Sequence, residues 1–380
     1  MKQMIFVRII QVLIMMAASC SGSQNTSSLQ TLPSLKNIFK EDFEIGAALN
    51  ASQIVEKDPR AAALIPMQFN VVTPENIMKA EIIHPRWDTY DFKLADKMIE
   101  YGKKHDILIN GHTLIWHSQL PDYARNIKNA DSFRTFFEDH IKTIAGRYKG
   151  SIFSWDVVNE ALNEDGTMRK TVFLEHLGDN YVTEAFRLAA AASPGTELYY
   201  NDYNNEQPAK RAGCIALIKK IQAAGVRIDG VGIQGHWHLN KIPLKDIEES
   251  ILQYSALGLK VMITELDVEV LPRNFEGADV SLKMQDSAFI NPYVNGLPDS
   301  VQQQLANDYA ALFYLFLKHR DKISRVTFWG VDDGQSWLNG WPVRGRTNHP
   351  LLFDRQLKPK PAFYKVVEIK NKLNAGKRGF

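Results

Sequence analysis

Short apolar runs alternate along this chain with longer segments whose apolar residues recur at helical spacing. Eight such runs predict strands at residues 44–50, 64–70, 107–116, 152–160, 197–202, 230–237, 260–267 and 325–332. Helical spacing predicts helices at 91–105, 132–148, 181–192, 208–224, 247–257 and 300–318. Strands that alternate with helices favour a parallel sheet. Eight of them fit a closed (β/α)8 barrel, the TIM barrel of the α/β class, better than an open sheet.

Polar or aromatic side chains occur at or near the carboxyl ends of the predicted strands. They are Asn70, His112, Asn159, Glu160, Asn201, Asp202, Gln234, His236, Glu265 and Trp329. A (β/α)8 barrel carries its active site at that end. An open nucleotide-binding sheet would instead have a Gly-rich turn after its first strand, where this chain has Asn50-Ala-Ser-Gln53. The sequence therefore predicts a barrel with a site at the carboxyl ends of its strands.

Two of the predicted strands end on a glutamate, at Trp155-Asp-Val-Val-Asn-Glu160 and Val261-Met-Ile-Thr-Glu265. Splitting a glycosidic bond requires one carboxyl group to protonate the leaving oxygen and a second to stabilise or attack the sugar cation. An ionised Glu265 would raise the pKa of a nearby Glu160 and keep it protonated. We expect the two carboxyl groups to lie about 5–5.5 Å apart, the spacing that retains the anomeric configuration.

Seven motifs in order resemble glycoside hydrolase family 10, whose members are mainly endo-β-1,4-xylanases, over roughly residues 40–370. The motifs are Phe69-Asn-Val-Val-Thr-Pro-Glu-Asn-Ile-Met-Lys79, Gly111-His-Thr-Leu-Ile-Trp-His117, Trp155-Asp-Val-Val-Asn-Glu160, Tyr200-Asn-Asp-Tyr203, Gly232-Ile-Gln-Gly-His236, Ile263-Thr-Glu-Leu-Asp267 and Thr327-Phe-Trp-Gly-Val331. The resemblance implies that Glu160 is the general acid/base and Glu265 the nucleophile. Asn159 fits a hydrogen bond to the sugar 2-hydroxyl, and His236 is expected to orient Glu265. Gln234 is expected to help position the nucleophile or the sugar.

Further residues are expected to bind the sugar chain, namely Glu75, Asn76, Lys79, His112, Trp116, Tyr203, Gln234, Trp329 and Trp337. The resemblance places Glu75, Asn76 and Lys79 on the non-reducing side of the cut, although their spacing also fits a solvated helix turn. Trp329 and Trp337 suit stacking on sugar faces, and Tyr203 is expected on the leaving-group side. The chain departs from the common pattern at Ala80, where Trp is frequent, and at Asp332, where Thr is frequent.

The charge balance argues against nucleic acid and polyanionic substrates. The chain has 45 basic and 43 acidic residues, a formal charge of +2, and no basic run interleaved with aromatic residues. The mechanism requires no cofactor, and we expect no metal ligands. The expected partners are xylan and xylo-oligosaccharides, with no nucleic acid, and we expect a monomer.

The amino-terminal segment predicts an export signal. Lys2 and Arg8 precede an apolar stretch that leads into Ala17-Ala18-Ser19-Cys20, which resembles a bacterial lipoprotein box with Ala17 in place of the usual Leu. We therefore expect a signal at 1–19, lipidation at Cys20, a tether at 20–36, one domain at 37–374 and a tail at 375–380. The protein would be exported and held by lipid at the periplasm or cell surface, or otherwise secreted, its only membrane contact being the anchor.

Three other readings remain open from the residues alone. One is a barrel glycosidase that acts on another β-glucan. The second is a metal-dependent hydrolase built on His236, His238 and Asp332. The third is a non-catalytic glycan-binding lipoprotein, which would not need both glutamates. Cys214 falls on a helical apolar stripe and is predicted to be a buried structural thiol, and Trp155 a core residue.

Overall fold

The computed structural model describes residues 32–273, 275, 277–284 and 291–377. The predicted signal, Cys20 and most of the predicted tether lie outside the described residues. One folded unit begins at Ser34. Its first helix, α2 (Leu35–Ile38), buries Leu35 completely, so packed structure starts within the predicted 20–36 tether. At the other end, α14 (Pro361–Lys377) continues into the predicted tail.

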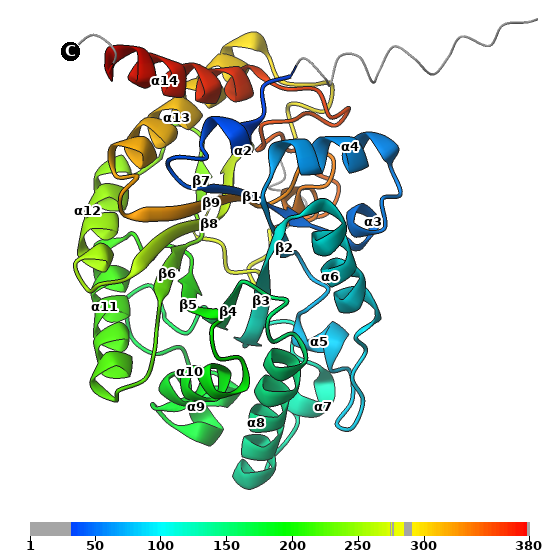
Figure 1. The fold of residues 1–380 in the computed structure, drawn as a ribbon, viewed down its shortest axis with the longest axis vertical. Coiled ribbons are helices and arrows are strands. Elements are labelled where there is room, and N and C mark those ends of the chain that lie inside the picture. The colour runs from blue at the N-terminus through cyan, green and yellow to red at the C-terminus, as the bar shows by residue number, and fades with distance from the viewer. Residues whose placement is uncertain (1–31, 274, 276, 285–290, 378–380) are drawn as a thin grey trace, which may run out of the picture. The chain divides into compact units, whose positions relative to one another are not determined.

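Eight parallel strands close into a barrel, and the predicted fold class is confirmed (Figure 1). The strands of the structure are β1 (Glu44–Leu49), β2 (Val71–Pro74), β3 (Leu108–Trp116), β4 (Ser154–Asn159), β5 (Glu197–Asp202), β6 (Gly230–Ile233), β7 (His236–His238), β8 (Lys260–Glu269) and β9 (Ile323–Phe328). They pair in chain order from β1 to β6, then β6 with β8, β8 with β9, and β9 with β1. The short β7 pairs with the outer part of β8.

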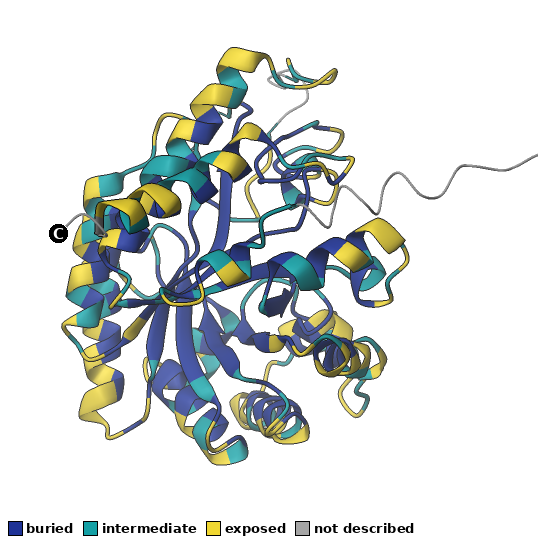
Figure 2. Ribbon diagram, turned by 45° about the horizontal axis from the view of Figure 1, so that its top comes forward, coloured by how far each residue is buried: buried dark blue, intermediate teal, exposed yellow. Residues whose placement is uncertain are grey.

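Helices surround the barrel and cover its outer face (Figures 1 and 2). Besides α2 and α14 they are α3 (Ala51–Ile54), α4 (Pro59–Gln68), α5 (Ala80–Ile83), α6 (Lys93–His105), α7 (Asp122–Arg125), α8 (Ala130–Arg147), α9 (Val172–Leu177), α10 (Tyr181–Ala192), α11 (Pro208–Ala223), α12 (Leu244–Ser255) and α13 (Asp299–Lys318), with the 3-10 turn η2 (Trp337–Asn339). Figure 2 shows buried strands and helices whose exposed residues face outward. Within the described residues, no helix is both long and apolar enough to cross a bilayer.

The predicted strand at 64–70 is wrong, because most of this segment is helical. Residues 59–68 form α4, which begins at the N-cap Asp58 with Pro59 in its first turn and buries Leu64 and Ile65. A short apolar run does not distinguish a strand from a buried helical face. The second barrel strand is β2, which follows Asn70 directly.

The predicted strand at 230–237 divides into β6 and β7. The break falls at Gln234 and Gly235, where Gly235 has a φ of +82°, a left-handed conformation that glycine adopts without strain. The last predicted strand, 325–332, ends at Phe328, so Trp329 stands just beyond it. The six predicted helices are all present with ends that differ by up to three residues.

The core contains the two residues assigned to it from sequence. Trp155 on β4 and Cys214 on α11 are both fully buried. The Trp155 ring lies against the backbone of Gly111 on β3, where an added Cβ would come within 2.2 Å of it. The close approach of these two strands therefore requires glycine at position 111.

Candidate active site

A cavity of about 510 Å³ opens at the carboxyl ends of the strands. All of the predicted catalytic and substrate-binding residues except Tyr203 line it. The lining residues are Glu75, Asn76, Lys79, His112, Trp116, Gln119, Asn159, Glu160, Gln234, His236, Glu265, Ala278, Val280, Lys283, Trp329, Trp337, Gly340, Trp341 and Arg344. Loops and strand ends far apart in sequence thus meet in one site.

Glu160 follows the last residue of β4 and has a left-handed backbone, with φ at +58°. Its Oε2 accepts a hydrogen bond from Trp116 Nε1 at 2.8 Å, and its Oε1 accepts from Gln234 Nε2 and Asn159 Nδ2, each at 3.1 Å. Burial raises the pKa of Glu160, and the charge of Glu265 adds to this, against the hydrogen bonds from Gln234 and Trp116. Raising this pKa favours the proton that a general acid needs.

Glu265 lies within β8 and is surrounded by donors. Its Oε1 accepts from Asn201 Nδ2 at 2.7 Å, and its Oε2 lies 3.3 Å from His236 Nε2. Burial acts to raise the pKa of Glu265, but the hydrogen bond from His236 and nearby positive charges outweigh it and hold the pKa below its ordinary value. The carboxylate is therefore favoured, as a nucleophile requires.

His236 is held as a cation by a second carboxylate. Its Nδ1 lies 3.0 Å from Asp267 Oδ1, while Trp337 Nε1 donates to Asp267 Oδ2 at 2.8 Å. Burial alone would lower the pKa of His236, but the charges of Asp267 and Glu265 raise it to about 10. His236 is thus positive at neutral pH and stabilises the charge of Glu265.

Amide side chains connect the two glutamates. Asn201 Nδ2 donates to Asn159 Oδ1 at 2.9 Å as well as to Glu265, and Gln234 Nε2 donates to Asn159 Oδ1 at 3.3 Å as well as to Glu160. From the sequence alone, the charge of Glu265 is the expected cause of a raised pKa at Glu160. In the structure burial is the larger cause, and that charge is a smaller one in the same direction.

Polar groups and one aromatic face form the side of the cavity near β2 and β3. Lys79 Nζ donates to Asn76 Oδ1 at 3.0 Å and to Gln119 Oε1 at 2.9 Å, and it lies 4.6 Å from the ring centroid of Trp116. Residues 75–79 are a loop that leads into α5, with Lys79 at its N-cap, rather than the helix turn considered from sequence. Burial raises the pKa of Glu75.

Aromatic rings lie beside the two histidines. The ring of Trp329 lies edge-on to His112, with centroids 5.3 Å apart, and Trp337 lies 5.0 Å from His236 and stacks on Trp341 at 4.7 Å. His112 itself is fixed by Asp156, whose Oδ2 lies 2.9 Å from its Nδ1. Contacts with these neighbouring rings therefore hold the indoles of Trp329 and Trp337 in place.

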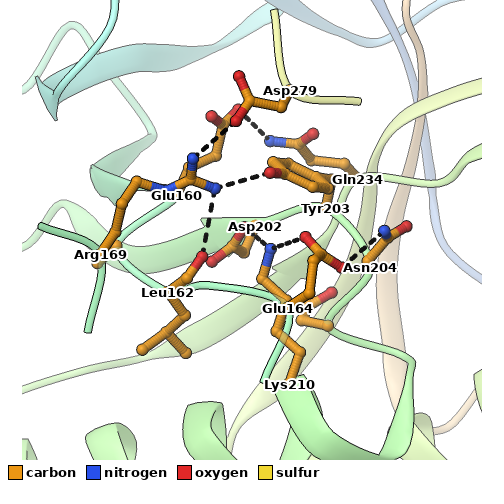
Figure 3. A network of polar contacts seen from close by, with 12 residues as sticks. Glu160, Leu162, Glu164, Arg169, Asp202, Tyr203, Asn204, Lys210, Gln234 and Asp279 are labelled. Atoms are coloured by element: carbon orange, nitrogen blue, oxygen red, sulfur yellow. Dashed lines mark hydrogen bonds and ion pairs between the residues drawn. The ribbon is translucent and has the colours of Figure 1, made fainter. Parts of the chain in front are cut away.

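Tyr203 is the predicted site residue that the structure does not bring into the cavity. Its hydroxyl accepts from Arg169 Nη2 at 2.7 Å, and Lys210 Nζ lies 3.7 Å above its ring (Figure 3). The side chain is buried, and Gly277 packs against its ring. Tyr203 is thus held by Arg169 and Lys210 and lies against Gly277 of the β8–α13 connection.

Several contacts in the site were missed from the sequence. Asn201 bonds both Glu265 and Asn159, Asp267 holds His236, and Gln119 holds Lys79. Asp267 stands two residues after Glu265 on one strand, and side chains at this spacing share a face. That spacing was a usable signal, whereas Gln119 lies in a loop with no periodic pattern.

The residues of the metal-site reading do not come together. His236 contacts two carboxylates, while His238 Nε2 accepts from Arg273 Nε at 2.6 Å. Among residues 32–273, 275, 277–284 and 291–377, no group of three or more His, Cys, Asp or Glu side chains has the geometry to hold a metal ion.

A parallel (β/α)8 barrel with one carboxyl group set for protonation and one held ionised across the same cavity defines a glycoside hydrolase. Comparison with known proteins then specifies the group. The profile described as glycosyl hydrolase family 10 matches residues 34–369. The chain belongs to glycosyl hydrolase family 10.

Curated relatives match over most of the chain. It is 43% identical to endo-1,4-beta-xylanase A of Xylanibacter ruminicola over 347 residues, which cover 90% of this chain and 94% of the relative. It is 35% identical to the beta-1,4-xylanase of Dictyoglomus thermophilum over 363 residues, covering 95% and 98%.

Solved structures show the same fold. A GH10 endoxylanase retrieved from a sugarcane soil metagenome superposes with a TM-score of 0.84 at 40% identity, covering 88% of this chain and 99% of that one. A mutant structure in complex with xylotriose superposes with a TM-score of 0.80 at 35% identity, covering 89% and 100%.

Proposed function

We propose that this protein is an endo-β-1,4-xylanase that cleaves internal bonds of xylan with retention of configuration. The observation that carries the proposal is the opposed electrostatic state of the two glutamates in one cavity, with the pKa of Glu160 raised and that of Glu265 lowered. The names of the relatives, and the xylotriose bound to one structural neighbour, support xylan as the substrate.

In the first half-reaction, Glu265 attacks C1 of the sugar while Glu160 gives its proton to the leaving oxygen. The C1–O bond to the leaving chain breaks, and an ester bond forms between C1 and a Glu265 oxygen. His236 and Asn201 hold the attacking carboxylate in position. Asn159 is placed between the glutamates, where its amide can bond the sugar 2-hydroxyl.

In the second half-reaction, Glu160 removes a proton from water, and the water oxygen attacks C1 and releases Glu265. Esterification removes the negative charge of Glu265, which contributes to the raised pKa of Glu160. The pKa of Glu160 then falls, so the same residue that served as acid now serves as base.

Product analysis tests this function. We expect xylan to give a ladder of short xylo-oligosaccharides, with negligible release of sugar from carboxymethyl cellulose. Proton NMR early in the reaction should show the β-anomer as the first product, since two displacements restore the configuration. Xylose alone from the start would contradict internal cleavage. Preferential hydrolysis of the cellulose derivative would point to a glycosidase for another β-glucan.

We also propose that residues 1–19 direct export and that Cys20 is acylated, with one catalytic domain at about 37–374 that acts as a monomer. The support is the charged, apolar and small-residue pattern before Cys20. Labelling of expressing bacteria with an alkyne fatty acid should mark the wild-type protein and not Cys20→Ala. An unlabelled protein released to the medium would favour ordinary secretion.

A further inference from the structure

The β8–α13 connection supplies one wall of the catalytic cavity. Ala278, Val280 and Lys283 from this connection line the cavity that contains both glutamates. Gly277, with φ at +86°, brings the backbone close to Asn204 and Tyr203. We refer to residues 277–283, all of which are described, as the wall segment.

An ion pair anchors the wall segment to the barrel (Figure 3). Arg169 Nη1 donates to Asp279 Oδ2 at 2.9 Å, while its Nη2 donates to Tyr203 and to the carbonyl of Leu162. The side chains of Arg169 and Asp279 are only 13% and 21% exposed. The anchor therefore fixes the segment that carries Lys283, which a free surface loop would not do.

Lys283 and Arg344 differ from Lys79 and His236, the cations of this cavity that other side chains already bind. Lys79 is bound by two amide oxygens, and His236 lies between two carboxylates. Lys283 and Arg344 are exposed, and neither makes an ion pair or hydrogen bond with any part of the chain that the structure describes. Two positive charges are thus available to a ligand in the same cavity.

The acidic groups of the cavity do not balance these cations. Burial raises the pKa of Glu75 and of Glu160, which favours their neutral forms, and Glu265 is matched by His236. The near-zero net charge of the whole chain conceals this local excess. A cavity lined by charge of one sign attracts ligands of the opposite sign.

We propose that Lys283 and Arg344 bind the carboxylate of a uronic acid branch on the xylan chain and make such substrates preferred. The backbone of xylan is neutral, so only a substituent can supply the negative charge. A branch on an occasional xylose unit carries one carboxylate, which differs from the polyanion that the overall charge argues against. The inference rests on the proposed xylanase function and names the substrate class of that site.

The test compares two oligosaccharides that differ only in charge. One is a xylo-oligosaccharide with a single glucuronic acid branch, and the other is the same molecule after reduction of its carboxyl group to an alcohol. For the wild-type enzyme at low ionic strength, we expect kcat/KM to be higher on the acidic form. Lys283→Gln and Arg344→Gln should each reduce this ratio roughly two- to fivefold, the range of exposed ion pairs. Added salt should reduce it as well.

Lys219→Gln is the matched control. Lys219 is exposed on α11, outside the cavity lining, and its replacement makes the same change in charge. We expect it to leave the ratio as in the wild type. A wild-type ratio of one or below would overturn the inference, and so would a ratio that stays unchanged when Lys283→Gln and Arg344→Gln are combined.

A third substrate separates this inference from the proposed function. Unbranched xylohexaose carries no charge, and the wild-type enzyme is expected to cleave it internally. If the enzyme cleaves xylohexaose but shows no preference for the acidic branch, only the proposed role of Lys283 and Arg344 is contradicted. If the enzyme cleaves neither xylohexaose nor either branched substrate, the proposed xylanase function itself is contradicted.

Discussion

The two candidate catalytic carboxyl groups share a cavity but differ in their immediate partners. Glu160 is bonded by neutral donors, the indole of Trp116 and the amides of Gln234 and Asn159. Glu265 is bonded by Asn201 and by a histidine that Asp267 keeps positive. Neutral donors leave the burial cost of a charge largely uncompensated, whereas a cation offsets it. This difference supports the proposed roles of Glu160 as the acid and Glu265 as the nucleophile.

Replacement of the acid/base should produce a rescue that depends on the leaving group. We expect Glu160→Ala to lose hydrolysis of xylan by about 100-fold or more, the usual scale of general acid–base catalysis. With an activated aryl xyloside, whose leaving group needs no proton, added azide should restore turnover and yield the β-azide. The measurement is initial rate with product NMR. Rescue of Glu265→Ala instead, with an α-azide product, would reverse the two roles.

The Asp267–His236 pair should set the acid side of the pH profile. In Asp267→Asn, one of the two carboxylate charges that raise the pKa of His236 to about 10 is removed. His236 then holds its proton less tightly, Glu265 loses part of its cationic partner, and the pKa of Glu265 rises toward its ordinary value. Because Glu265 must be ionised, the acidic limb of kcat/KM should move to higher pH.

Asp267→Glu keeps the charge and serves as the control for that shift. We expect it to move the acidic limb less than Asp267→Asn, even if both lower the rate at the optimum. An acidic limb that stays in place in Asp267→Asn would show that Glu265 does not depend on this pair.

Sequence reasoning recovered the residues of the site better than their connections. Asn159 and Glu160 stand at the carboxyl end of β4, Glu265 lies in the outer half of β8 and His236 follows the break after β6. Closure of the barrel brings such positions together. The Arg169–Asp279 pair joins residues 110 apart through loops. No periodicity governs loop positions, so neither the wall segment nor its contact with Tyr203 could be predicted from the sequence.

At the scale of elements, the contact between β3 and β4 depends on one glycine. Gly111→Ala would place a Cβ 2.2 Å from the Trp155 ring, and we expect it to lower the free energy of unfolding by about 1–3 kcal/mol, the range for overpacking. Chemical denaturation measures this change. Gly146→Ala on α8 is the matched control, since its Cβ would meet nothing within 4 Å. Alanine at position 146 should raise the free energy of unfolding by about 0.5–1 kcal/mol. Equal changes at positions 111 and 146 would show that the contact with Trp155 does not require glycine.

The elements were predictable where length and periodicity agreed. All six predicted helices and the alternation of strands with helices were recovered, because packing against the barrel imposes an apolar period. The sequence did not predict α4 or the 17-residue α14. The segment 64–70 was mistaken for a strand because seven residues span only about two helical turns, too few to reveal the helical period. The short helices α3, α5 and α7 have four residues each and present no period at all.

At the scale of the whole molecule, an ion pair joins the last helix to the start of the first strand. Lys370 on α14 pairs with Asp42, just before β1, and their side chains are 8% and 2% exposed. Arg320 Nη1 lies farther from Asp42, at 3.8 Å. We expect Lys370→Met to lower the free energy of unfolding by about 3 kcal/mol, because it leaves a carboxylate buried without its close partner.

The double variant Lys370→Met with Asp42→Leu tests the cause of that loss. Replacing both charges by apolar groups should recover most of the stability, since no unpaired charge remains. Denaturant titration of the wild type and both variants gives the comparison. A double variant as unstable as the single one would assign the loss to packing instead.

The guanidinium of Arg169 touches three separate connections of the barrel, through Leu162, Tyr203 and Asp279. A foreign loop grafted between β8 and α13 would leave Arg169 without its carboxylate partner near Glu160, unless the graft supplied a carboxylate of its own. Engineering of new substrate preferences into this barrel therefore requires that the β8–α13 loop be exchanged together with a carboxylate that pairs with Arg169.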